Sequence, residues 1–124
     1  MPPAIAPAVS DSSHPDMAES VDGIRELVKS RIRADDAFGS ALFAEAVEVM
    51  LSDDMATAGN VLSDYIEATI GFADLSAQSG LPAEMLRDMF GSAGDPRAAD
   101  LFRVLGLLQR HQGIRLQVGT AARA

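Results

Sequence analysis

The chain has 124 residues, of which 48% are hydrophobic and 5% aromatic, and its formal net charge is −8. This length and apolar content suit one folded domain with an aliphatic core, which is typical of helices, and the lack of cysteine excludes disulfides and thiolate metal sites. The acidic balance argues against a strong general affinity for nucleic acid, because phosphate contacts need lysine and arginine, but it leaves room for a local basic face.

The sequence gives no support to a metal site or a membrane segment. His14 and His111 are far apart and have no ligand spacing around them, so we expect no metal and no cofactor. No apolar run approaches the ~20 residues that a spanning helix needs, and residues 1–9 lack the basic region of a secretory signal. We therefore expect a cytoplasmic protein without a membrane contact.

A proline-rich segment precedes the first predicted helix. Residues 1–18 carry four prolines and should form a mobile, disordered tail. The pattern then predicts a helix over about 19–33, whose basic end either complements the helix dipole on a solvated face or contacts phosphate. These basic residues are Lys29, Arg31 and Arg33. The apolar stripe of this helix contains Val21, Ile24, Leu27, Val28 and Ile32.

Two further helices are expected before the central motif. The first should be capped by Asp35 or Asp36 and run to about Leu51. Its inner side contains Phe38, Leu42, Phe43, Ala46, Val47 and Met50. The break at residues 52–54 should cap the next helix, over about 54–69. The inner stripe of that helix contains Met55, Ala58, Leu62, Tyr65 and Thr69.

Residues 72–90 form the most informative pattern, a short helix, a glycine turn and a second short helix. Gly80 accepts a left-handed backbone without strain, and Pro82 suits the first position of the second helix. One face of that helix is apolar and contains Leu86, Met89 and Phe90. Two small helices joined by a tight turn predict a helix-turn-helix. An ordinary helical hairpin is the alternative.

The last third of the chain predicts a loop and a longer helix. Asp95 should cap this helix and Pro96 should be its first residue, and the helix should end at about Gln112. Its core stripe contains Leu101, Val104, Leu105 and Leu108, which Phe102 and Leu107 widen. Gly113 should end the helix.

Residues 114–118 alternate apolar and polar side chains, which predicts a strand. One isolated strand is unstable, and no other segment has a strand pattern. We therefore expect this segment to pair with the same segment of a second copy, in a two-fold homodimer. The interface would contain Ile114, Leu116 and Val118. The alternative is that these three side chains pack on the core as an extended tail.

Taken together, residues from about 42 to 118 resemble a known family. The matching features are Leu75…Gly80-Leu81…Leu86, the loop Gly94-Asp95-Pro96, the helix Leu101-Phe-Arg-Val-Leu105 and the end Gly113-Ile-Arg-Leu-Gln-Val118. In order and spacing they are similar to the Cro/repressor-type helix-turn-helix proteins described as addiction-module antidotes or prophage regulators. The resemblance implies an autoregulatory DNA-binding protein, often dimeric and often encoded beside a toxin.

The expected fold is an all-α, compact helical bundle with a helix-turn-helix core and a short C-terminal strand. The chain would divide into a tail at 1–18, N-terminal helices at 19–52, the helix-turn-helix domain with its strand at 53–118, and a tail at 119–124.

The second helix of the motif would be the recognition helix. Arg87 could read guanine, and Glu84 could accept a hydrogen bond from cytosine. The expected DNA-binding residues are Pro82, Ala83, Glu84, Arg87, Asp88 and Arg97. The helix departs from the family pattern, because members usually open it with serine followed by polar or basic residues, and its acidic residues would lower affinity for DNA.

Three classes of function can be weighed. The first is a transcriptional regulator that binds a double-stranded DNA operator, as an antitoxin that represses its own operon would. The concentration of arginine in the C-terminal third favours it, unless those arginines pair with the surplus acids. The alternative is a helix-turn-helix-derived module that binds a toxin or another protein and has lost DNA binding, which the acidic balance favours. An enzyme is not expected, because no nucleophile–base pair, phosphate loop or metal spacing is present.

Overall fold

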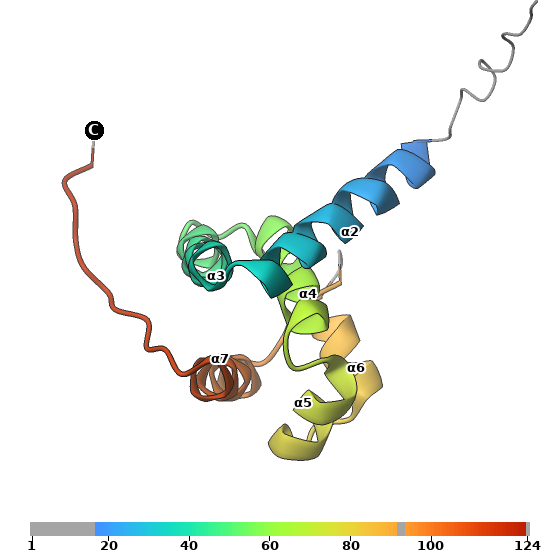
Figure 1. Cartoon of the computed structure of the whole chain (residues 1–124). Helices are drawn as coiled ribbons and strands as arrows, with labels where there is room; N and C mark the ends of the chain where they lie inside the picture. Colours follow the sequence, from blue (N-terminus) through green and yellow to red (C-terminus); the bar gives the residue numbers. More distant parts are fainter. Residues whose placement is uncertain (1–16, 92–93, 124) are drawn as a thin grey trace, which may run out of the picture.

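The computed structural model describes residues 17–91 and 94–123, which form six α-helices and no β-strand (Figure 1). The expected all-α class is confirmed. The helices are α2 (Met17–Ala34), α3 (Asp36–Leu51), α4 (Met55–Ala68), α5 (Phe72–Ser79), α6 (Ala83–Met89) and α7 (Ala98–Gln112). Most of the predicted tail, residues 1–16, lies outside the described part. No helix in the described part combines the length and apolarity needed to cross a bilayer.

Aspartate caps set the starts of α3 and α4, as the sequence predicts. Asp35 accepts a hydrogen bond from the backbone N–H of Phe38 at 3.2 Å, and Asp54 accepts one from that of Thr57 at 3.1 Å. Each carboxylate satisfies a backbone donor that the start of a helix leaves free. Of the two candidate caps for α3, Asp35 takes this role and Asp36 is the first helical residue.

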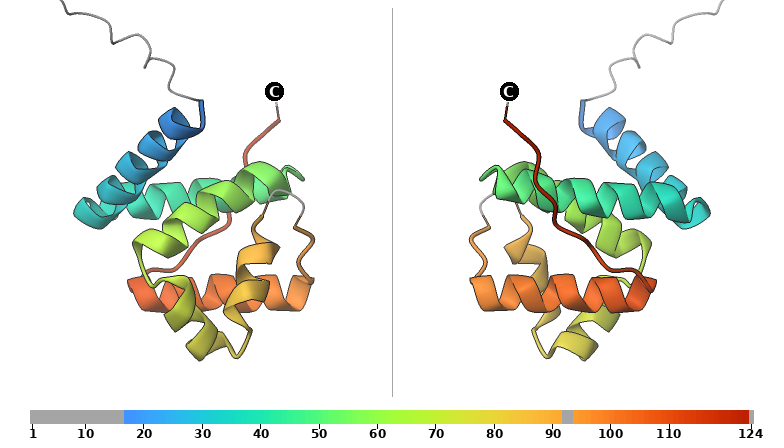
Figure 2. Two further views of the ribbon diagram at one scale, coloured as in Figure 1. Left: turned by 90° about the vertical axis from the view of Figure 1, so that its right-hand side faces the viewer. Right: turned by 90° about the vertical axis from the view of Figure 1, so that its left-hand side faces the viewer.

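The core lies where α3 and α4 meet α5, α6 and α7, with α5 and α6 packed beside α7 (Figure 2). The rings of Phe43 and Tyr65 stack with their centroids 4.9 Å apart and join α3 to α4. Aliphatic side chains complete the core, as the composition predicts. Those without exposed surface include Leu62, Ile66, Leu75, Leu86, Val104 and Leu108.

Gly59 in α4 allows the close approach of α4 to the end of α6. A Cβ atom at Gly59 would lie 2.7 Å from the backbone carbonyl oxygen of Phe90. Backbone atoms at that distance cannot move aside as a flexible side chain can, so only glycine fits without a shift of the helices. This contact explains a glycine in the middle of a helix, where it otherwise lowers stability.

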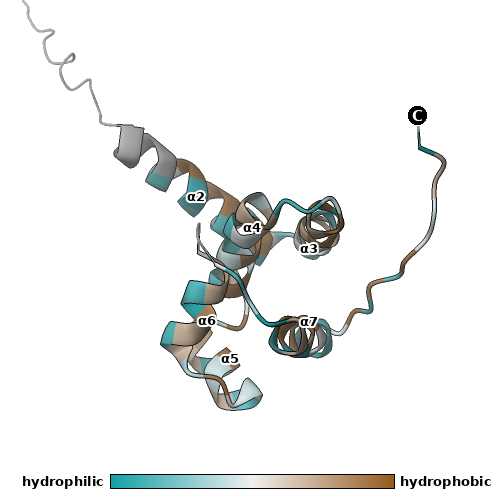
Figure 3. Ribbon diagram, turned by 180° about the vertical axis from the view of Figure 1, so that it is seen from behind, coloured by the Kyte–Doolittle hydropathy of each residue, from teal (hydrophilic) through white to brown (hydrophobic). Residues whose placement is uncertain are grey.

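The predicted apolar stripe of α2 is only partly correct. Ile32 is buried, but Ile24 and Leu27 are 60% and 71% exposed. The side chain of Val21 lies outside the described part of the structure. The helix projects away from α5, α6 and α7, and hydrophilic and apolar bands alternate along it (Figure 3).

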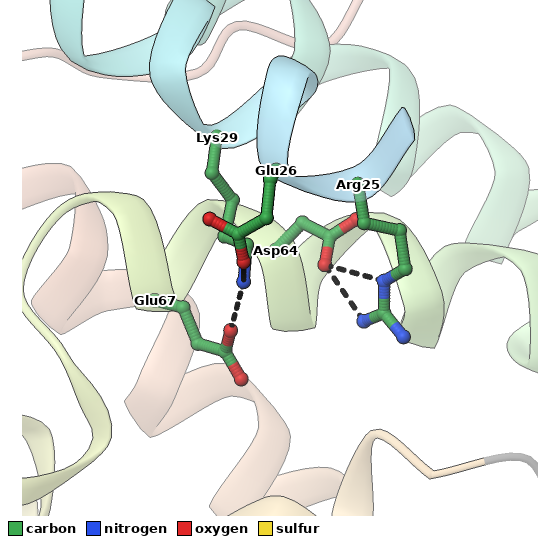
Figure 4. A network of polar contacts seen from close by, with 5 residues as sticks. All are labelled: Arg25, Glu26, Lys29, Asp64 and Glu67. Carbon is green, nitrogen blue, oxygen red and sulfur yellow. Dashed lines mark hydrogen bonds and ion pairs between the residues drawn. The ribbon is translucent and has the colours of Figure 1, made fainter. Parts of the chain in front are cut away.

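Two ion pairs turn the charged side of α2 toward α4 (Figure 4), which explains why Ile24 and Leu27 are exposed. Arg25 donates from Nε and Nη2 to Oδ1 of Asp64, at 3.0 and 2.7 Å. The Nζ atom of Lys29 lies 2.7 Å from Glu67 and 2.8 Å from Glu26. Lys29 is therefore engaged within the chain, which argues against a phosphate contact by this residue.

Helix α7 begins later than the sequence predicts. The prediction that Asp95 caps it and Pro96 is its first residue is wrong, since Arg97 is the N-cap and Ala98 the first residue. Residues 94–97, the described part of the linker to α7, are not helical, and Gly94 lies against the backbone at the end of α6. A Cβ atom at Gly94 would overlap backbone carbonyl oxygens of α6, so only glycine fits at this position.

The predicted core stripe of α7 is correct at Val104, Leu105 and Leu108, which are buried. The prediction that Phe102 widens this stripe is wrong, because its side chain is 68% exposed. Phe102 precedes Val104 by two residues, and such a spacing places side chains on nearly opposite sides of a helix.

The C-terminal segment, residues 114–123, contains neither helix nor strand in this single chain. Gly113 adopts the left-handed conformation with φ 68° and ends α7 as predicted. Ile114 donates its backbone N–H to the Gln109 carbonyl at 3.0 Å, and Leu116 donates to Oε1 of Gln109 at 2.7 Å. Ile114 and Leu116 pack against the core, while Val118 is 87% exposed. This packing fits the extended-tail alternative, and strand pairing with a second chain stays a prediction.

Candidate nucleic-acid interface

The turn between α5 and α6 is built around Gly80, which has a φ of 78° in the left-handed region. Ser76 donates from Oγ to the carbonyl of Leu81 at 2.6 Å, and Leu81 donates its N–H to Oγ of Ser79 at 3.1 Å. Arg103 of α7 donates from Nη1 to the Ser79 carbonyl at 3.3 Å. The two serines therefore hold the turn, and Arg103 joins the end of α5 to α7.

The inner and outer sides of α6 differ in burial. Leu86, Met89 and Phe90 are buried, as predicted, so the remaining positions form an outer side. Pro82 precedes α6 as its N-cap residue, one position earlier than predicted. Of the six residues predicted to bind DNA, the structure exposes Pro82, Glu84, Arg87, Asp88 and Arg97 and half-buries Ala83.

Arg87 is positioned by an aromatic contact within the motif. Its guanidinium carbon lies 5.2 Å from the centroid of the Phe72 ring, at the start of α5. Phe72 itself is buried, so the ring is a fixed platform for an exposed cation. The contact links the start of α5 to the outer side of α6.

A shallow cavity of about 260 Å³ lies where the outer side of α6 meets the linker to α7. Its lining brings together Asp88 and Arg97, which are both predicted site residues, although nine positions separate them. Met85 also lines it and is 37% exposed, although it is not among the residues predicted to bind DNA. Its place three residues before Asp88 on a helix is the signal that could have assigned it to the same side.

The two halves of the chain differ sharply in charge. Residues 19–81 contain twelve acidic and four basic residues, whereas residues 82–124 contain four acidic residues and six arginines. Within the described residues, none of these six arginines forms an ion pair. They are Arg87, Arg97, Arg103, Arg110, Arg115 and Arg123. The possibility that they pair with the surplus acids is therefore not realised in the described part of this chain.

The groups with shifted pKa values include the ion-paired residues that join α2 to α4. The hydrogen bond to Asp64 raises the pKa of Arg25, and hydrogen bonds to Glu26 and Glu67 raise that of Lys29. The hydrogen bond from Lys29 lowers the pKa of Glu26. Burial raises the pKa of Tyr65 to about 12. These groups stabilise the N-terminal helices and lie outside α5 and α6.

The part of the chain that the structure describes contains no cluster of side chains that could form a metal site. No group of three or more histidine, aspartate or glutamate side chains there has an arrangement that could hold an ion. His14 lies outside the described residues, and His111 is exposed in the last turn of α7.

No protein-family model, curated protein or solved structure gives a significant match to the chain. The resemblance to repressor-type regulators thus stays a prediction from the residues, and a functional proposal has to rest on the geometry and charge of the molecule.

Proposed function

We propose that the protein is a sequence-specific DNA-binding regulator in which α5, the Gly80 turn and α6 form a helix-turn-helix. The left-handed glycine, the buried inner side of α6 and its exposed outer side all support this proposal. Helix α6 would enter the major groove, and α5 would lie across the DNA backbone.

The observation that carries the proposal is the set of six arginines without an ion pair in the described residues. Arginines that have no carboxylate partner keep their charge available to phosphate, and each phosphate contact releases counterions and adds affinity. The acidic residues concentrate in the preceding part of the chain, so the field of the protein would orient its basic half toward DNA.

Base readout would depend on two exposed side chains of α6. Arg87 can donate two hydrogen bonds to O6 and N7 of guanine, and Glu84 can accept one from the amino group of cytosine. The Phe72 ring below Arg87 limits the freedom of the guanidinium and so reduces the entropy lost on binding.

A homodimer would complete the DNA-binding unit. Pairing of residues 114–118 between two copies would present two α6 helices to successive major grooves, about 34 Å apart. The family resemblance adds the expectation that the operator lies before the protein's own gene and that a toxin is encoded beside it. The protein would then act as the antitoxin and repress that operon.

The test is titration onto the DNA upstream of the protein's own gene, with unrelated DNA as competitor. Competitor-resistant binding is expected. Arg87→Ala should cost about 1–3 kcal/mol and relax specificity at one position. Arg33→Ala is the matched control, because Arg33 is an exposed arginine at the end of α2, and its removal should leave the isotherm unchanged. Absence of binding by the wild type at low salt would overturn the proposal.

A second candidate is a protein-interaction module without DNA binding. The exposed Ile24 and Leu27 on α2 favour it, because two apolar side chains on one projecting helix suit contact with another protein. In that case a variant with Ile24 and Leu27 both changed to serine would lose a partner protein, and the DNA titration would show nothing for any variant.

A further inference from the structure

We propose that the groove between α3 and the C-terminal segment receives the C-terminal segment of a second copy of this chain. The groove has a volume of about 120 Å³. Its walls contain Val47, Glu48 and Leu51 of α3 together with residues 116–119. The inference rests on the homodimer included in the proposed function and is independent of DNA binding.

The walls of the groove carry two large apolar side chains that the single chain leaves in water. Leu51 is 76% exposed and Val118 is 87% exposed, and both line the groove. Single exposed apolar residues are normal on protein surfaces, but neighbouring ones mark a contact surface. Covering them would remove apolar area from water at the centre of the proposed contact.

The backbone of the C-terminal segment has one satisfied edge and one open edge. The N–H groups of Ile114 and Leu116 both bond to Gln109. In an extended chain the N–H groups of alternate residues point to the same side, so those of Arg115 and Gln117 point the other way. They have no hydrogen-bond partner among the described residues. Such an edge can pair with another extended segment.

Charge selects a second copy as the occupant. Residues 35–54, which include α3, contain six acidic residues and no lysine or arginine, whereas residues 101–124 contain four arginines and no acidic residue. Neither Arg115 nor Glu48 forms an ion pair in the described part of the chain. A second copy would bring its basic C-terminal segment to this acidic helix, whereas an acidic segment at the same place would be repelled.

The symmetry of the contact follows from its position on the chain. The right-hand view of Figure 2 shows the C-terminal segment crossing α3, and residues 116–119 of this segment line the groove. A two-fold axis through this surface lets each copy seat its segment against α3 of the other. Leu51 of one copy would then lie close to Val118 of its partner.

Sedimentation equilibrium of the full chain without DNA tests the inference. The wild type is expected to be a dimer, and Leu51→Glu should weaken its association about tenfold or more, because symmetry introduces the change at two contacts. Leu27→Glu is the matched control, since Leu27 is also a highly exposed helical leucine, and its dimer should be unchanged. A monomeric wild type, or a dimer that Leu51→Glu leaves intact, would overturn the inference.

Charge reversal tests the pairing without depending on one variant. Glu48→Arg and Arg115→Glu should each weaken the dimer, and the double variant should regain part of the association, with the same helix content by circular dichroism in all forms. A double variant that associates no better than either single variant would contradict the pairing. A stable dimer that fails to bind DNA would count only against the proposed function, so the two failures can be told apart.

Discussion

The two halves of the molecule use their basic residues differently. In α2, Arg25 and Lys29 are bonded to acidic residues of α4 and hold one helix on another. From α6 onward, the six arginines have no ion pair in the described residues. A paired cation contributes to the fold, whereas an unpaired one is available to an external anion. The net charge of −8 hides this division, so the distribution of charge is a better guide to function than its sum.

The largest effect on stability is expected where α4, in the acidic half, contacts the end of α6, in the basic half. Gly59→Ala should lower the free energy of unfolding by about 1–3 kcal/mol, because the new Cβ atom would press on the carbonyl of Phe90 and separate α4 from α6. Gly23→Ala is the control, since a Cβ atom there meets nothing within 4 Å and should add up to about 1 kcal/mol through helix propensity. Urea unfolding measures both, and equal effects would contradict the contact.

Loss of one member of the ion pair between Arg25 and Asp64 should lower the free energy of unfolding. Arg25→Met leaves the carboxylate of Asp64, whose side chain is 11% exposed, without its cation. We expect a loss of about 1–2 kcal/mol, less than for a fully buried pair because the Arg25 side chain is 41% exposed. Arg110→Met in the unpaired half should stay within about 0.5 kcal/mol of the wild type. Thermal unfolding distinguishes the two, and a reversed order would refute the difference between the halves.

Acidification should weaken the ion pair that Glu26 and Lys29 form within α2. Lys29 holds the pKa of Glu26 below its ordinary value of 4.5, so the stabilisation is complete above pH 4.5 and is lost as the pH falls through the lowered pKa. Unfolding measured from neutral to acidic pH should show this loss in the wild type and a shallower loss in Lys29→Met. An identical pH dependence in both proteins would show that the pair contributes nothing.

The smallest effect is expected at Arg31, which has partners but remains in solvent. It lies 4.5 Å from the centroid of the Phe38 ring and 3.9 Å from Asp35, with its side chain 63% exposed. Arg31→Ala should therefore change stability by at most about 1 kcal/mol and leave DNA affinity unaltered. Calorimetry and the DNA titration check this, and a marked loss of DNA affinity would extend the binding surface into α2.

Local sequence signals predicted most of the fold. The caps Asp35 and Asp54 and the glycines Gly80 and Gly113 act through neighbouring backbone atoms, so they can be recognised without knowledge of the tertiary structure. The spacing of apolar residues in α3, α4 and α6 likewise predicted which sides are buried.

Errors arose where distant residues decide the outcome. The side of α2 that faces α4 depends on Arg25 and Asp64, which are 39 positions apart, and the start of α7 depends on the passage of Gly94 over α6. The candidate site was predictable residue by residue along α6. The sequence did not predict that α6 and residues 94–97 line one cavity. It also did not predict that Gln109 anchors the C-terminal segment.

The most direct test of the division of charge is the salt dependence of binding to the DNA upstream of the protein's own gene. The logarithm of the association constant should fall with the logarithm of salt concentration by about 0.9 per phosphate contact. Arg97→Gln combined with Arg110→Gln should reduce this slope, whereas Arg31→Gln combined with Arg33→Gln should preserve it. Equal slopes for both double variants, or no binding at low salt, would contradict a role for the unpaired arginines in contacting DNA.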